Sequence, residues 1–248
     1  VKPVLKAGDN RRMTYDHDLE INRPWYYSTY LVDSDIAVEF TPGKKAGIFR
    51  FVFPQGSSKA LIFDKYNGGT SELNLVSTKE LTGMETWNGV KVYMYGLLNT
   101  SAKAAKEGSN LTLTLNDQAG KTVELKYALS FVSPEQAKKN FDNELKAISF
   151  QQQVKDGEAA WAKVINQIQV AGGTEAQKRT FYTSLYRTYE RMVDITEDGQ
   201  YYSGYDKQVH KTNRPFYVDD WVWDSYLAHH PLRTILNPAQ EGDMLNSY

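Results

Sequence analysis

The sequence changes its pattern within one stretch, Ser130-Phe131-Val132-Ser133-Pro134-Glu135-Gln136-Ala137. Upstream of it, short apolar segments alternate with turn residues, which is typical of β-strands. Within it, Ser133 is a residue type preferred at a helix N-cap, and Pro134 is preferred at the first helical position. Downstream, apolar residues recur at helical spacing, at Ala137, Phe141, Leu145 and Ile148. The stretch therefore predicts a boundary between a β-rich region and a helical region.

The region before this boundary is expected to form a β-sandwich. Its candidate strands are residues 26–31, 36–40, 48–53, 60–63, 73–77, 91–97, 111–115 and 123–132. Turn signals separate them, among them Asp33-Ser34-Asp35 and Pro42-Gly43. Many short strands joined by turns indicate an antiparallel sandwich, and we assign residues 1–132 to it.

The region after the boundary is expected to be mostly helical. A second helix is predicted over residues 156–168, with four buried residues, Trp161, Val164, Ile165 and Ile168, and a break at Gly172-Gly173. Thr174-Glu175-Ala176-Gln177 fits a capping box that starts a third helix. Asp198-Gly199 predicts a hairpin turn, and Asn237-Pro238 begins a last helix that is expected to continue to Tyr248. We assign residues 133–173 to a helical linker and 174–248 to the beginning of an α-rich domain.

The composition excludes several classes of function. Lys and Arg number 29 against 30 Asp and Glu, so the chain lacks the basic charge that binds nucleic acid or an anionic membrane. It has no Cys, which excludes disulfides, thiolate nucleophiles and zinc–thiolate sites. The sequence contains no apolar run long enough to span a membrane. Aromatic residues reach 13%, which fits either an aromatic-rich sandwich core or surfaces that stack on sugars.

The candidate chemistry lies in the segment 215–226. Trp223 and Asp224 are expected to line a pocket, because an indole covers the apolar face of a pyranose while a carboxylate accepts from its hydroxyls. We interpret Asp219 and Asp220 as the N-cap and the helix-dipole partner of the helix that carries this pair. Carboxylates four or five positions apart could also serve as an acid and a base, so spacing leaves that role open.

The histidines give weaker indications. His17 lies in Tyr15-Asp16-His17-Asp18-Leu19-Glu20, a polar and aromatic segment that is either a solvated loop or part of a domain interface. His229 and His230 are expected to point apart on a helix and to have packing or helix-dipole roles. The sequence contains neither the HExxH pattern of zinc proteases nor the GxSxG pattern of serine hydrolases.

The motifs, taken in order, resemble those of glycoside hydrolase family 92. In the β region the resemblance rests on residues 15–20, 24–28, 46–50 and 53–54. In the helical region it rests on residues 130–133, 137–140, 172–174, 181–186, 198–203, 223–226 and 230–232. The sequence departs from the family at Ser225, where Thr is common, and at Leu227, where Arg is common, so a charge contact near the pocket is expected to be missing.

The resemblance implies an exo-acting α-mannosidase that inverts configuration, depends on calcium and releases terminal mannose from α-mannoside glycans such as N-glycans. It implies a β-sandwich joined by helices to an (α/α)6 toroid, both truncated in this chain. Trp223, Asp224 and His17 are expected at the mannose subsite. The general acid, the general base and most calcium ligands are expected beyond the C-terminus, in remaining segments of the same enzyme, and the resemblance implies a periplasmic, cell-surface or secreted location.

Two other functions stay open at this point. The chain could be a non-catalytic carbohydrate-binding module that retains the sandwich and its aromatic residues. It could instead come from another sandwich-plus-toroid enzyme, such as a phosphorylase acting on a different sugar.

Overall fold

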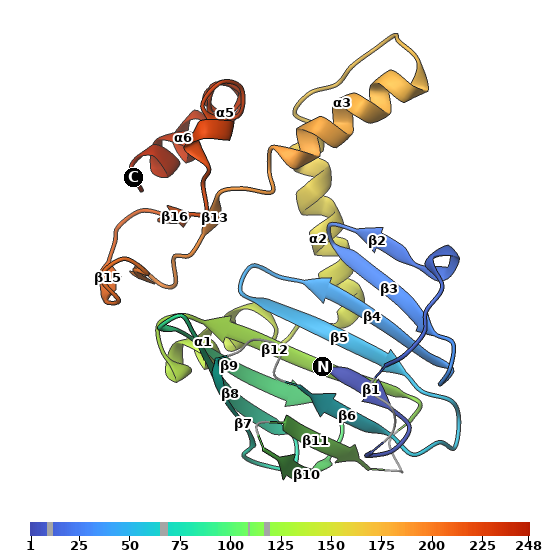
Figure 1. Ribbon diagram of the computed structural model, residues 1–248. Coiled ribbons are helices and arrows are strands. Elements are labelled where there is room, and N and C mark those ends of the chain that lie inside the picture. The colour runs from blue at the N-terminus through green and yellow to red at the C-terminus, as the bar shows by residue number, and fades with distance from the viewer. Residues whose placement is uncertain (9–11, 65–68, 109, 117–119) are drawn as a thin grey trace. The chain divides into compact units, whose positions relative to one another are not determined.

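The computed structural model describes residues 1–8, 12–64, 69–108, 110–116 and 120–248. They form two compact units, Val1–Glu158 and Ala159–Tyr248. The fold is antiparallel β-sheet followed by helices, as the sequence predicted (Figure 1). The domain boundaries assigned from the sequence stay predictions.

Two sheets build the sandwich of the first unit. The larger has the order β2-β3-β4-β5-β12-β9-β8-β7, with bounds Ile21–Arg23, Tyr26–Leu31, Ile36–Pro42, Ala46–Val52, Thr122–Ser130, Val90–Leu98, Glu80–Trp87 and Thr70–Leu75. The smaller has the order β1-β6-β11-β10, with bounds Lys2–Val4, Ala60–Phe63, Asn110–Leu115 and Ala102–Glu107. All neighbouring strands in both sheets pair antiparallel.

The central strands of the larger sheet bury side chains on both faces. On one face Phe51 and Leu125 pack with Leu61 and Leu113 of the smaller sheet. On the other face residues such as Ile48 pack against α1 (Pro134–Glu144) and the start of α2 (Phe150–Ile165). Because successive side chains of a strand point to opposite faces, the run Ile48–Phe51 supplies both cores.

The local sequence signals that predicted two helix starts and a helix break are confirmed. The Ser133 side chain accepts from the Gln136 amide at 3.1 Å, with Pro134 opening α1. The α3 helix (Glu175–Arg187) starts with the reciprocal capping box of Thr174 and Gln177. Gly172 and Gly173, at φ 75° and 70°, lie in the left-handed region, where glycine is favoured.

Two predicted helices have different bounds from those expected. The second helix, α2, begins at Phe150, six residues before the expected start, and Gly157 lies inside it. A Cβ on Gly157 would lie 2.7 Å from Cβ of Trp25, so close packing against this tryptophan explains a glycine within the helix. The last helix, α6 (Pro238–Leu245), does not continue to Tyr248, because Asn246 is its C-cap.

The second unit is built from α3, short strands and a group of small helices. Its strands form two antiparallel pairs, β13 (Val193–Asp194) with β16 (Tyr217–Val218) and β14 (Gln200–Tyr202) with β15 (Val209–Lys211). The predicted turn at Asp198-Gly199 is present, with φ 49° and 77°. The helices α4 (Val222–Ser225), α5 (His229–Leu236) and α6 follow β16.

A buried arginine fixes the helices of the second unit to each other. Arg233 of α5 is 2% exposed, and its guanidinium lies 3.9 Å from the centre of the Tyr189 ring. It donates to the Thr188 carbonyl at 2.7 Å and to Gln240 Oε1 of α6 at 3.1 Å. Thr188 directly follows α3 and Gln240 belongs to α6. The Arg233 side chain of α5 therefore connects three segments of the unit. Among the residues that the structure describes, no helix has the length and apolarity needed to cross a membrane.

Candidate functional site

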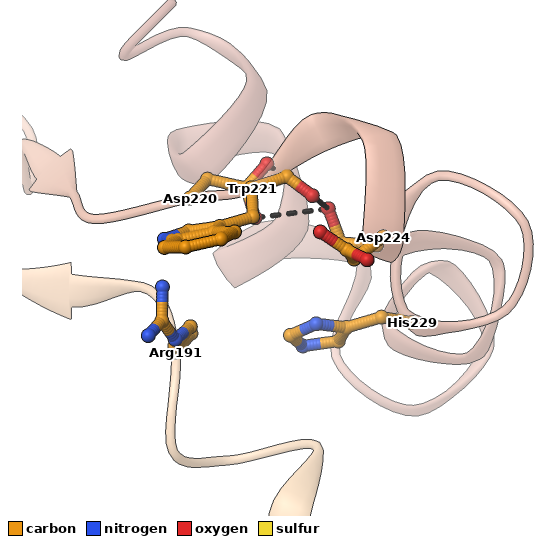
Figure 2. Close-up of a pocket in the computed structure, with 6 residues that line it drawn as sticks. Arg191, Asp220, Trp221, Asp224 and His229 are labelled. Atoms are coloured by element: carbon orange, nitrogen blue, oxygen red, sulfur yellow. Dashed lines mark hydrogen bonds between the residues drawn. The ribbon is translucent and has the colours of Figure 1, made fainter.

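A pocket of about 340 Å³ lies beside the one-turn helix α4 in the second unit (Figure 2). Its lining combines carboxylate, hydroxyl, imidazole, guanidinium and indole groups, from Arg191, Asp220, Trp221, Asp224, Ser225 and His229. The lining is more polar than that of most small-molecule sites, so a ligand with many hydrogen-bonding groups suits it best.

The local backbone determines which side chains of this segment reach the pocket. After β16, Asp219 adopts the left-handed conformation at φ 64°, which Asp tolerates better than most residues. The chain then enters α4, where the Asp224 and Ser225 amides donate to the Trp221 carbonyl at 2.7 and 3.1 Å. Residues three and four apart share a helix face, so Trp221, Asp224 and Ser225 all line the pocket.

Arg191 forms the wall opposite this turn. Its guanidinium carbon lies 4.9 Å from the centre of the Trp221 ring, and Figure 2 shows it beneath the indole. Its Nη1 also lies 3.1 Å from Asp219 Oδ1. Arg191 therefore contacts both the indole and Asp219, and the indole stays 60% exposed.

The structure separates the two predicted pocket residues of α4. Asp224 lines the pocket, but Trp223 is 87% exposed and is absent from the lining; its ring lies 6.3 Å from that of Tyr226. Trp223 is two positions from Trp221, which turns it to another side of the helix. Trp221 is the pocket indole that the sequence reasoning missed, and counting positions from Asp224 along the helix would have found it. The roles in substrate binding stay predictions.

The interpretation of Asp219 and Asp220 as helix caps is wrong. The N-cap of α4 is Trp221, and no side chain caps the helix. Asp219 instead pairs with Arg191, while Asp220 accepts from Ser225 Oγ at 2.9 and 3.1 Å. The left-handed turn at Asp219 moves the helix start one residue beyond the predicted caps.

A buried network of charged groups lies behind the pocket. His230 Nδ1 is 2.7 Å from Glu241 Oε1, and His230 Nε2 is 3.2 Å from Asp220 Oδ2. The side chains of His230, Asp220 and Glu241 are 13%, 4% and 3% exposed. The Tyr248 hydroxyl also donates to Asp220.

His229 and His230 do not point apart as expected. Their rings are stacked, with centroids 5.5 Å apart and an interplanar angle of 7°. Each ring has its own partner, because His229 bonds the Thr188 backbone while His230 reaches Asp220 and Glu241. These contacts override the divergence expected from helix geometry alone.

Ser225, His230 and Glu241 follow the order of a nucleophilic triad, with Ser225 Oγ 3.2 Å from His230 Nε2. The rest of the geometry does not fit that chemistry. The Ser225 hydroxyl donates to Asp220. The backbone amides of Asp224 and Ser225 both donate to the Trp221 carbonyl, so neither amide is free to stabilise an oxyanion. These contacts instead join the turn of Asp220 and Ser225 to α5 and α6.

The pKa values of two pocket groups are shifted for identifiable reasons. Burial alone would raise the pKa of the Asp220 carboxyl, but hydrogen bonds from Tyr248, Ser225 and His230 outweigh it and hold that pKa below its usual range. Burial is the main cause that lowers the pKa of His229, and the nearby charges of Arg233 and His230 lower it further. Asp220 is thus held as a carboxylate and His229 as a neutral imidazole.

His17, the third predicted site residue, belongs to the first unit. It begins the short helix η1 (His17–Leu19), and its Nδ1 lies 2.8 Å from Glu20 Oε2 with the His17 side chain 78% exposed. Its ring meets that of Tyr15 edge-on at 5.0 Å. Its place at the mannose subsite stays a prediction.

Within the part of the chain that the structure describes, no group of three or more His, Asp or Glu side chains is placed to hold a metal ion. The two most buried carboxylates near the pocket, Asp220 and Glu241, are both directed at His230.

Solved structures of similar fold are mannosidases. One is the family GH92 inverting mannosidase BT2199 from Bacteroides thetaiotaomicron, with TM-score 0.85 and 24% identity, covering 95% of this chain and 35% of that one. Another is the family GH92 α-mannosidase BT3965 from the same organism, with TM-score 0.85 and 25% identity, covering 95% of this chain and 36% of that one. BT3965 is also known in complex with mannoimidazole.

This chain thus spans about a third of the length of the proteins that it resembles. No curated protein sequence matches it. Two family models match in succession and together cover nearly all of it. The glycosyl hydrolase family 92 N-terminal domain matches residues 2–140, and the family's catalytic domain matches residues 136–248. The resemblance seen in the motifs is therefore confirmed, and the chain belongs to glycosyl hydrolase family 92.

Proposed function

We propose that the protein is an exo-acting α-mannosidase that releases terminal mannose from α-mannoside glycans. The observation that carries the proposal is the match of both family domains, one after the other, to a chain with a sugar-sized pocket. The names of its structural neighbours, an inverting mannosidase and an α-mannosidase, support the substrate class.

The pocket offers complementary groups to a pyranose. The Trp221 indole presents an apolar surface for the C–H face of the ring, and the Asp224 carboxylate accepts hydrogen bonds from hydroxyls. Nε2 of His229 is buried and has no hydrogen-bond partner among the described residues. Because the lowered pKa keeps this imidazole neutral, Nε2 is an unpaired hydrogen-bond acceptor directly behind the pocket surface.

These residues recognise the sugar, and none is assigned as acid or base. Asp220 is the most buried pocket carboxylate, but it already accepts from Ser225, His230 and Tyr248, which leaves it unsuited to proton transfer. An inverting mechanism requires two carboxyl groups about 6.5–9.5 Å apart, one protonating the leaving oxygen and one activating water. We propose that both come from segments that the longer relatives have and this chain does not span.

Calcium dependence is part of the proposal for the whole enzyme. Calcium binds oxygen ligands, so sugar hydroxyls and protein carboxylates would share it, most of the protein ligands lying outside this chain. From the glycan-degrading role we also propose a location in the periplasm, at the cell surface or in the medium. Fractionation of the producing cells would test it.

The experiment is mannose release from α-linked mannobioses by the enzyme at the full length of its relatives, with calcium and then with EDTA. We expect calcium-dependent release of β-mannose, seen by proton NMR within the first minutes. This chain alone should bind methyl α-mannoside without turnover, and should bind methyl α-glucoside, its C2 epimer, more weakly. Binding without turnover at full length would instead indicate a carbohydrate-binding module, and turnover that requires phosphate would indicate a phosphorylase.

A further inference from the structure

We infer that His230 is a positioning residue that holds the pocket-lining turn from behind, through its hydrogen bond to Asp220. The inference rests on the proposed function, because it explains how the groups that would bind mannose are kept in place. His230 itself is not among the residues that line the pocket.

The first step is the place of Asp220 between the pocket and the network. Asp220 lines the pocket, yet its side chain is only 4% exposed, because its oxygens are directed at groups behind the turn. Three donors converge on it, the hydroxyl of Ser225, the hydroxyl of Tyr248 and Nε2 of His230. Ser225 belongs to the same turn and Tyr248 is 63% exposed, so His230 is the buried donor from outside the turn.

The second step is the fixed orientation of the His230 ring. Glu241 of α6 holds Nδ1 at 2.7 Å, while Asp220 meets Nε2 at 3.2 Å. A carboxylate oxygen lies against each ring nitrogen, so both contacts depend on one and the same orientation of the ring. Rotating the ring would break both hydrogen bonds, and leaving largely buried polar groups unpaired is costly.

The third step is the rigidity of the helix that carries His230. Arg233, three residues further in α5, is anchored to the Thr188 carbonyl at 2.7 Å and lies 3.5 Å from the Arg191 carbonyl. The same helix therefore holds the turn of Asp220 through His230 and reaches the backbone of the opposite wall through Arg233. Loosening the contact of His230 with Asp220 should release the turn that lines the pocket and leave the wall formed by Arg191 unchanged.

Two substitutions at His230 separate its two contacts. The amide nitrogen of Asn lies about as far from Cβ as Nδ1 of His, and that of Gln about as far as Nε2. His230→Asn therefore keeps a donor to Glu241 and loses the one to Asp220, whereas His230→Gln does the reverse. The matched controls are His210→Asn and His210→Gln, at an exposed histidine whose Nε2 lies 2.7 Å from Asp206.

The experiment measures the affinity for methyl α-mannoside and, independently, amide hydrogen exchange of the segment 219–226. We expect His230→Asn to weaken binding about tenfold, which is the equivalent of one hydrogen bond to a charged group, and to speed exchange in this segment. His230→Gln should restore both toward the wild-type values even if it lowers the melting temperature more, and the His210 variants should change neither. Equal affinity and equal exchange in His230→Asn and His230→Gln would overturn the inference.

Failure of the proposed function can be told apart from failure of this inference. If the wild-type protein does not bind methyl α-mannoside, the sugar assignment fails, but exchange in residues 219–226 still decides whether His230 orders the turn. If neither variant folds, the ring ¹⁵N shifts of His230 in the wild-type protein take their place. A change in these shifts on adding methyl α-mannoside, with His210 unchanged, would support the coupling, and no change at His230 would overturn it.

Discussion

The pair of Glu39 and Arg50 gives a quantitative prediction for the stability of the sandwich. The carboxylate of β4 meets the guanidinium of β5 through two hydrogen bonds, Nε to Oε2 at 2.6 Å and Nη2 to Oε1 at 2.7 Å. Tyr26 donates to the same carboxylate at 2.7 Å, and the guanidinium carbon lies 4.0 Å from the centre of the Phe150 ring. Replacing Glu39 with Gln keeps the shape of this cluster but removes its negative charge.

The expected loss follows from burial and geometry. Removing one partner of a fully buried ion pair costs about 3–5 kcal/mol, because the other charge stays uncompensated. The side chains of Arg50 and Glu39 are 19% and 15% exposed, so water compensates part of this charge. We therefore expect Glu39→Gln to lower the free energy of unfolding by about 2–3 kcal/mol, below the fully buried range.

Urea unfolding of a double-mutant cycle tests this reasoning. Glu39→Gln, Arg50→Met and the double variant should give a coupling energy of at least about 1 kcal/mol, with unchanged m-values. The control cycle is Lys138→Met with Asp142→Asn, an exposed pair at 2.7 Å with side chains 51% and 36% exposed. Exposed helical pairs of this kind contribute about 0.3–0.5 kcal/mol. A coupling at Glu39–Arg50 no larger than in the control would refute the argument from burial.

Three further predictions concern the pocket, the pH dependence and the packing of the sheet. Trp221→Ala should weaken methyl α-mannoside binding at least about tenfold in a calorimetric titration, since it removes the aromatic surface, whereas Trp223→Ala should change it less than about twofold. The pKa of His229 is lower in the folded than in the unfolded state, so the unfolded state binds a proton at higher pH. The free energy of unfolding should therefore fall as pH drops below about 6.5, and melting curves of His229→Gln should show a smaller fall over the same pH range. Gly47→Ala would place a Cβ 2.8 Å from the Phe40 ring and should lower unfolding free energy by about 1–3 kcal/mol. Gly96→Ala, whose nearest contact would be 3.5 Å, should cost less than about 1 kcal/mol in the same denaturation assay.

The features that the sequence predicted well depend on neighbouring residues only. A helix cap, a capping box and a two-residue hairpin turn each need a few specific residue types within four positions, as at Ser133, Thr174 and Asp198-Gly199. Strands with clear apolar patterns, such as β3 and β6, were also found at their observed bounds. In these cases local chemistry and the final fold favour the same structure.

Strands that depend on a partner were missed. The edge strand β10 has the sequence Ala-Lys-Ala-Ala-Lys-Glu at 102–107, which has helical propensity and no alternation of large apolar residues. Its pairing with β11 over six residues supplies the hydrogen bonds that its own sequence does not signal. Likewise β8 was not predicted; it contains Gly83, yet it lies between β7 and β9 and pairs with both.

The candidate site also combines features set by neighbouring residues with features that depend on distant partners. Asp224 could be predicted, because a carboxylate and an indole within one short segment already suggest a sugar pocket. The choice between Trp221 and Trp223 required only the position of the helix start, which the left-handed conformation of Asp219 shifts by one residue. The contacts of His230 with Asp220 and Glu241 span ten and eleven residues across three segments, and no local pattern encodes them. Since the turn that lines the pocket has no side-chain cap of its own, its geometry depends on this distant network. A substitution at His230 should therefore alter a site whose lining residues are all unchanged.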